Sequence, residues 1–195
     1  MKLLKLLIVA GFMTVIGACA PLTSERLADA NAMKPSGNAF QTALWKGYTT
    51  EAGYELTTLM NLCMAELFID KAMMAAKAQS PAPEDPKNAY NAAHIRSDQA
   101  SALQAAHARL TKGLADNGTQ KAPDKAAEAQ VSYDCWLEHE VEGWIKGGYH
   151  TARLDSCKAR FMAAMDAVEA ALKVVVAPAP VVAPAKMPGP YTVYF

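Results

Sequence analysis

The stretch LDSCKARFMAAMDAVEAALKVV, residues 154–175, has the most regular hydrophobic pattern in the chain. Its apolar side chains return every three or four residues, a spacing that puts them on one face of an α-helix. These side chains are Leu154, Cys157, Phe161, Met165, Val168, Leu172 and Val175. A helix with one apolar stripe needs other elements to cover that stripe, so the stretch predicts a packed helical core.

The same spacing, with capping and breaking residues at the ends, predicts further helices. They cover about residues 23–33, 38–74, 98–116 and 123–145. The helix over 38–74 is a long one, with Gly47 and Gly53 as places where it can bend, and the Pro-rich tract 79–86 is a loop. Abundant alanine favours helix over sheet. The sequence therefore predicts an all-α fold, an antiparallel bundle of about five helices in a domain over 38–176.

Two cysteines lie at mirror positions around a predicted helix break. Cys135 and Cys157 are equally far from Lys146, which stands beside Gly147 and Gly148. In an antiparallel hairpin such residues come level, and inward Cα atoms of helices packed about 8–10 Å apart are within disulfide reach. The spacing predicts a Cys135–Cys157 disulfide, with two buried free thiols as the alternative.

Few residues suggest chemistry. His139-Glu140 resembles the start of a zinc-protease motif, but Gly143 occupies the position of its second histidine. Glu138, Glu140 and Glu142 around His139 are able to bind a cation, yet a solvated helix face is the favoured interpretation.

The remaining candidates are read as structural. Cys63 is predicted to be a small core residue, and Trp136 and Trp144 either line a groove or pack in the core. We therefore expect no catalytic residue, no metal site and no cofactor apart from a covalent lipid, and we expect that the protein is not an enzyme. The net charge of +0 gives no electrostatic case for nucleic acid as a partner.

The N-terminus has the pattern of an export signal. Lys2 and Lys5 accompany an apolar run over 6–16 that is too short to cross a membrane, and Ile16-Gly17-Ala18-Cys19 follows. An aliphatic residue, two small residues and cysteine resemble the lipobox of bacterial lipoproteins.

The lipobox resemblance implies a membrane anchor. Residues 1–18 would be a signal peptide, Cys19 the acylated first residue, and 19–37 a tether with a short helix. Because Ala20 rather than Asp follows the cysteine, the resemblance implies the periplasmic side of the outer membrane as the location.

The C-terminus resembles the entry to another domain. A Pro/Ala/Val linker over 177–190 leads to the strand-like residues 191–195. With the segments 20–27 and 133–138 and with Cys157, this pattern is similar to the OmpA family of outer-membrane lipoproteins.

The OmpA-family resemblance implies a structural or scaffolding role in the cell envelope. Relatives bind peptidoglycan through a C-terminal domain, of which residues 191–195 would be only the first strand, so peptidoglycan binding is not expected of this chain. The alternative is a complete periplasmic adaptor that binds a protein or lipid partner in a helical groove around Trp136 and Trp144. The binding residues and the protein partner stay unassigned.

Overall fold

The computed structural model describes residues 22–142, 148–173 and 189. Within these ranges every regular element is helical and no strand occurs, so the predicted all-α fold is confirmed. The expectations for Cys19, for the linker over 177–190 and for the strand over 191–195 fall outside the described residues. None of the helices in the described part is long and apolar enough to cross a membrane.

The described part of the chain begins with a helix over 22–32 and continues through a series of α-helices and two π-helical turns. The α-helices are α2 (Ala39–Tyr54), α3 (Leu62–Ala76), α4 (Ala89–His94), α5 (Ala100–Gly113), α6 (Thr119–Lys121), α7 (Pro123–Val141) and α8 (Gly148–Lys173). The π-helical turns are η1 (Glu55–Leu59) and η2 (Leu114–Gly118).

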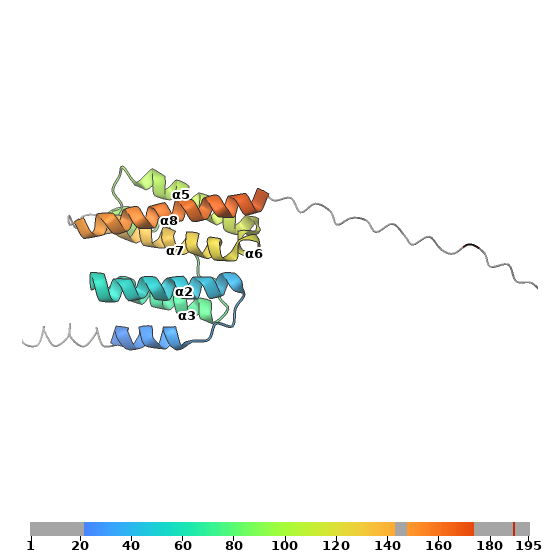
Figure 1. Cartoon of the computed structure of the whole chain (residues 1–195). Coiled ribbons are helices and arrows are strands. Elements are labelled where there is room, and N and C mark those ends of the chain that lie inside the picture. Colours follow the sequence, from blue (N-terminus) through green and yellow to red (C-terminus); the bar gives the residue numbers. More distant parts are fainter. Residues whose placement is uncertain (1–21, 143–147, 174–188, 190–195) are drawn as a thin grey trace, which may run out of the picture.

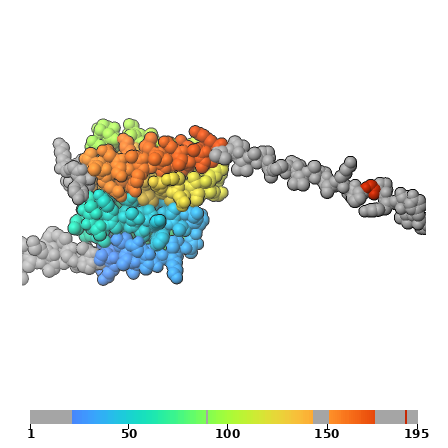
Figure 2. Space-filling model, viewed as in Figure 1, coloured from blue at the N-terminus to red at the C-terminus, as the bar shows by residue number. Residues whose placement is uncertain are grey.

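The bundle has two halves that share α7 (Figure 1). One half consists of the helix over 22–32, α2 and α3, and its core includes Phe40, Leu44 and Phe68. The other half consists of α5, α7 and α8, with Trp136 and Phe161 in its core. Figure 2 shows the surfaces of the two halves pressed together along their length. The helix α7 is therefore the central element of the fold.

The stretch predicted as one long helix is a hairpin of α2 and α3. The backbone reverses at Met60, which has the left-handed φ of 56°, and at Asn61, whose side-chain oxygen accepts a hydrogen bond from Met64 N and caps α3. The far ends of the hairpin meet where Ser36 N donates to Ala76 O at 3.0 Å. Folding back covers the apolar face of α2, which a single straight helix would leave open to water.

Two residues considered in the sequence have a different environment from the one expected. Cys63 is exposed instead of buried, because α3 turns Ala65 and Phe68 toward the core. Gly47 marks a close approach of helices rather than a bend, since a Cβ there would lie 2.8 Å from Val131 Cγ2 on α7. The absence of a side chain at Gly47 thus lets α2 pack tightly on α7.

The described chain enters and leaves the bundle at opposite ends. The helix over 22–32 starts at the end where Asn61 contacts Glu142, at the close of α7. The last helix, α8, starts at that same end and finishes beside the start of α7, where Lys121 Nζ lies 3.4 Å from Leu172 O. Residue 22 and Lys173 are therefore separated by the length of the bundle (Figure 1).

Candidate functional site

From Ala129 to Val141 the central helix α7 is buried on all sides, its polar residues included. Its buried polar residues are Gln130, Ser132, Asp134, Glu138, His139 and Glu140. The interpretation of the Glu138–His139–Glu140 region as a solvated face is wrong, because both halves of the bundle pack against α7. Burying charged groups costs free energy unless they are paired, so the partners of these side chains decide what α7 does.

Asp134 lies at the centre of the first polar network. Its carboxylate accepts hydrogen bonds from Lys71 Nζ at 2.7 Å, from Tyr48 Oη at 2.6 Å and from Glu84 N at 2.8 Å. Lys71 also lies 2.7 Å from the Glu84 carboxylate. Gln130 Nε2 donates to Tyr48 Oη at 3.0 Å. We call these five residues the Asp134 network.

The Asp134 network fastens the loop over 79–86 to three helices. Gln130 Nε2 donates to Pro81 O at 2.7 Å, and Lys71 Nζ donates to Ala82 O at 3.0 Å. Burial acts to lower the pKa of Lys71, but Asp134 and Glu84 outweigh it, so this pKa lies above its usual value and the amine stays charged. The network joins α2, α3 and α7 through satisfied, charge-assisted hydrogen bonds.

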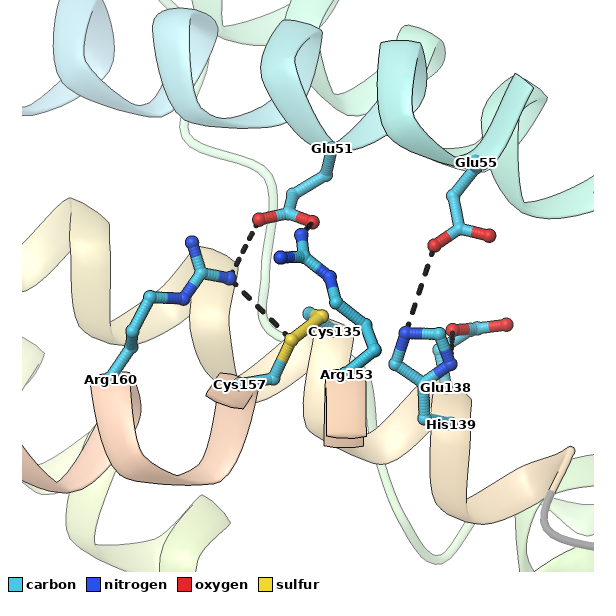
Figure 3. The surroundings of a disulfide bond; sticks show 8 residues. All are labelled: Glu51, Glu55, Cys135, Glu138, His139, Arg153, Cys157 and Arg160. Carbon is cyan, nitrogen blue, oxygen red and sulfur yellow. Dashed lines mark hydrogen bonds and ion pairs between the residues drawn. A yellow bond between two sulfur atoms is a disulfide. The ribbon is translucent and has the colours of Figure 1, made fainter. Parts of the chain in front are cut away.

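A second network joins α2 to α8. The buried carboxylate of Glu51 accepts hydrogen bonds from Arg153 and, at 2.7 Å, from Arg160 (Figure 3). The guanidinium of Arg153 also lies over the ring of Tyr54, 4.2 Å from its centroid. Two arginines of α8 thus neutralise one acid of α2.

The disulfide lies directly beside Glu51 and its two arginines. Cys135 on α7 is bonded to Cys157 on α8, with their Cα atoms 5.8 Å apart, at the pair that the mirror placement predicts. Both residues are fully buried. Arg160 Nη2 lies 3.5 Å from Cys157 Sγ. The bond fixes the register of α7 against α8.

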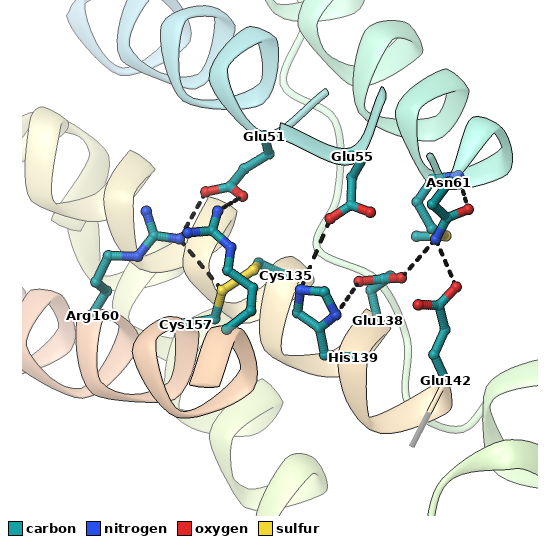
Figure 4. A network of polar contacts seen from close by, with 11 residues as sticks. Glu51, Glu55, Asn61, Cys135, Glu138, His139, Glu142, Cys157 and Arg160 are labelled. Carbon is teal, nitrogen blue, oxygen red and sulfur yellow. Dashed lines mark hydrogen bonds and ion pairs between the residues drawn. A yellow bond between two sulfur atoms is a disulfide. The ribbon is translucent and has the colours of Figure 1, made fainter. Parts of the chain in front are cut away.

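The third group of polar residues surrounds Glu55, where η1 begins. Glu55 Oε1 lies 3.9 Å from His139 Nε2, and His139 Nδ1 lies 3.0 Å from Glu138 Oε2. Asn61 Nδ2 donates to Glu138 at 3.2 Å and to Glu142 at 2.6 Å (Figure 4). We call Glu55, Asn61, Glu138, His139 and Glu142 the Glu55 cluster.

The Glu55 cluster has an excess of acid groups. Burial, followed by the charges of Glu142 and Glu51, raises the pKa of Glu55 to about 8. Burial and the charge of Glu55 also raise the pKa of Glu138 well above its usual range. The other two networks pair each buried acid with a cation, whereas the Glu55 cluster concentrates carboxyl groups around one imidazole.

The groove that the sequence suggested around Trp136 and Trp144 is not seen at Trp136, which is buried. Trp136 is 2% exposed and packs against Tyr133 and Phe161, and Trp144 lies outside the described residues. A different pocket, of about 370 Å³, opens beside the Glu55 cluster and is lined in part by Asn61, Glu138 and Glu142.

Comparison of the chain with protein-family profiles, with curated proteins and with solved structures found no match in any of the three.

Sequence reasoning singled out Glu138, His139 and Glu142, but it missed Glu51 and Glu55. A signal for them exists, since Glu51 and Glu55 continue the spacing of the buried Leu44 and Tyr48 along α2. Acids that stand at core positions of an amphipathic helix indicate buried polar contacts.

Proposed function

We propose that the protein is an outer-membrane lipoprotein whose helical domain is a rigid spacer in the cell envelope. In this proposal Cys19 carries the lipid anchor, and the segment after Lys173 faces away from the membrane. The observation that carries the proposal is the position of residue 22 and Lys173 at opposite ends of the bundle (Figure 1).

Chain lengths support the spacer. Only a few residues separate Cys19 from the first helix, and an extended chain spans at most about 3.6 Å per residue, so the near end of the bundle stays within roughly 10 Å of the anchor. At the other side, the 26 residues of α8 cover about 39 Å. An upright bundle therefore carries the chain tens of ångströms from the bilayer surface.

The internal connections support rigidity. The Cys135–Cys157 bond and the pairing of Glu51 with Arg160 tie α8, which holds the exit of the chain, to α7 and α2. The Asp134 network ties α2 and α3 to α7. A force between the anchor and the exit would thus act on cross-linked helices rather than on a single contact surface.

The resemblance to OmpA-family lipoproteins agrees with this role. In that family a linker such as 177–190 connects a membrane-proximal part to a module that meets the cell wall. A spacer that begins at the membrane and ends at such a linker fits the structural or scaffolding role in the envelope.

Replacing Cys19 with serine tests the anchor. We expect the wild-type protein to fractionate with outer membranes, and its intact mass to show loss of residues 1–18 and addition of acyl chains. The Cys19→Ser variant has no thiol to acylate, so it should keep its signal or leave the membrane fraction. Cys63→Ser, which alters the exposed free thiol, is the matched control and should fractionate like wild type. A wild-type mass without acyl chains, or a Cys19→Ser variant that loses its signal and still fractionates with membranes unchanged, would refute the lipoprotein assignment.

A further inference from the structure

The carboxylate of Glu55 has no hydrogen-bond partner although it is fully buried. Its side chain is 0% exposed, and neither of its oxygens accepts a hydrogen bond from any residue that the structure describes. The 3.9 Å between Glu55 Oε1 and His139 Nε2 is too long for a hydrogen bond. An ionised group in this position is costly, and the carboxylate points into a cluster with two further acids (Figure 4).

We propose that Glu55, Glu138 and His139 bind one divalent transition-metal ion of the Zn²⁺ class. Each residue offers one ligand atom, and these three atoms all lie within 4.8 Å of one another. Ligands that surround a four-coordinate Zn²⁺ at about 2.0–2.2 Å are roughly 3.4 Å apart. Binding an ion therefore requires the three ligand atoms to draw closer together than the 4.8 Å within which they lie.

The donor types favour this class of ion. One imidazole nitrogen with carboxylate oxygens is a donor set for Zn²⁺ and its first-row neighbours, whereas Mg²⁺ and Ca²⁺ prefer oxygen alone. Cys135 and Cys157 also lie within reach of His139, but their sulfur atoms are joined in the disulfide and are not thiolates. The oxidised protein therefore presents a nitrogen and oxygen site.

The acidic groups of the site favour the binding of a cation. Arg153 and Arg160, the nearby arginines of α8, are both hydrogen-bonded to Glu51. A bound divalent ion would neutralise Glu55 and Glu138 together. Burial and neighbouring acids raise the pKa of both groups, and the charge of Arg153 opposes this only in part at Glu55, so the positive charge of an ion would act against the same cause.

The fold holds the ligands from two directions and leaves an entrance. The turn η1 and the reversal at Met60 place Glu55 and Asn61 over the end of α7. Asn61 Nδ2 donates to both Glu138 and Glu142, so it orients an acid of the site from the outside, as supporting residues do in metal centres. The pocket of about 370 Å³ reaches Glu138 from the surface and gives an ion a path of entry.

Titration calorimetry of the oxidised mature protein with Zn²⁺ tests the site. We expect one saturable site in the wild type. Glu55→Gln keeps the shape of the side chain and should lower the affinity by at least about 100-fold, because it removes a direct ligand. Glu138→Gln should weaken binding similarly. Glu128→Gln, the same substitution on α7 at a side chain that is 40% exposed, is the matched control and should bind like wild type.

Two further measurements, of the fold and of the ligand type, accompany the calorimetry. Circular dichroism of Glu55→Gln without metal should show the wild-type fold, since the change removes a buried carboxyl group that makes no hydrogen bond to the described residues. Co²⁺ in place of Zn²⁺ should give visible absorption without a thiolate-to-cobalt band in the near ultraviolet. Absence of saturable Zn²⁺ binding, binding unaffected by both Glu55→Gln and Glu138→Gln, or a thiolate band would each overturn the proposal.

Discussion

Replacing Asp134 with alanine is expected to lower the free energy of unfolding by about 3–5 kcal/mol. The change leaves the ammonium group of Lys71 in the core without its buried partner, and it removes the acceptor of Tyr48 Oη and of Glu84 N. The loop over 79–86 should loosen at the same time, because Lys71 Nζ also holds Ala82 O. Urea denaturation followed by circular dichroism measures the loss, and proteolysis measures the loosened loop.

Two controls separate the buried network from acids in general. Asp166→Ala removes one of the two acids paired with Arg109, at a side chain that is 71% exposed, and it should cost less than about 1 kcal/mol. The double change Lys71→Met with Asp134→Leu removes both charges and should recover much of the stability. If Asp134→Ala and Asp166→Ala were equally mild, the Asp134 network would not hold the fold together.

Removing the disulfide should cost on the order of 3 kcal/mol. Cys135 and Cys157 are 22 positions apart in sequence, so the bond restricts a sizeable loop of the unfolded chain. Helicity should survive in the reduced protein or in Cys157→Ala, because Phe161, Met165 and Val168 still bury the apolar face of α8. Thermal denaturation with and without a reductant measures the effect.

Peptide mapping without reduction identifies the bonded pair. The map should link the peptides that contain Cys135 and Cys157 and leave Cys63 unlinked, and Cys63→Ala should denature like wild type. A major cross-link through Cys63, or a reductant that does not change stability, would contradict the register of α7 against α8.

The second half of the fold could be predicted from the sequence because its signals are local. The stripe from Leu154 to Leu172 determines the buried face of α8, and Pro123 marks the start of α7. The mirror placement of Cys135 and Cys157 needs only the assumption of an antiparallel hairpin. Each of these inferences depends on residues that are close together in the chain.

The reversal at Met60 and Asn61 could not be predicted in this way. Apolar residues keep the helical spacing across it, from Leu56 and Leu59 to Cys63, so periodicity alone favours one long helix. What breaks the helix is a backbone cap made by Asn61 and the burial gained when α3 folds onto α2. The second of these is a tertiary effect that sequence spacing does not contain.

The burial of the polar residues of α7 likewise could not be predicted from sequence spacing. Charged residues usually face water, and that general tendency predicted a solvated face for Glu138 and Glu140. Their burial follows from partners that are distant in sequence, such as Asn61 for Glu138 and Arg96 for Glu140, which it contacts at 3.0 Å. Because Glu55 reaches the Glu55 cluster only through the reversal, the sequence alone did not reveal the candidate metal site.

The most direct test of the spacer is to measure how far each of its two ends lies from the membrane surface. Fluorophores on Glu25→Cys and Lys173→Cys, each in a Cys63→Ala background, report their distances to an acceptor dye in bilayers that hold the lipid-anchored protein. The spacer predicts that the label at residue 173 lies farther from the bilayer than the label at residue 25, by roughly 30–40 Å, the length of α8. Equal distances for the two labels would mean that the bundle lies flat on the membrane and would contradict the proposed function.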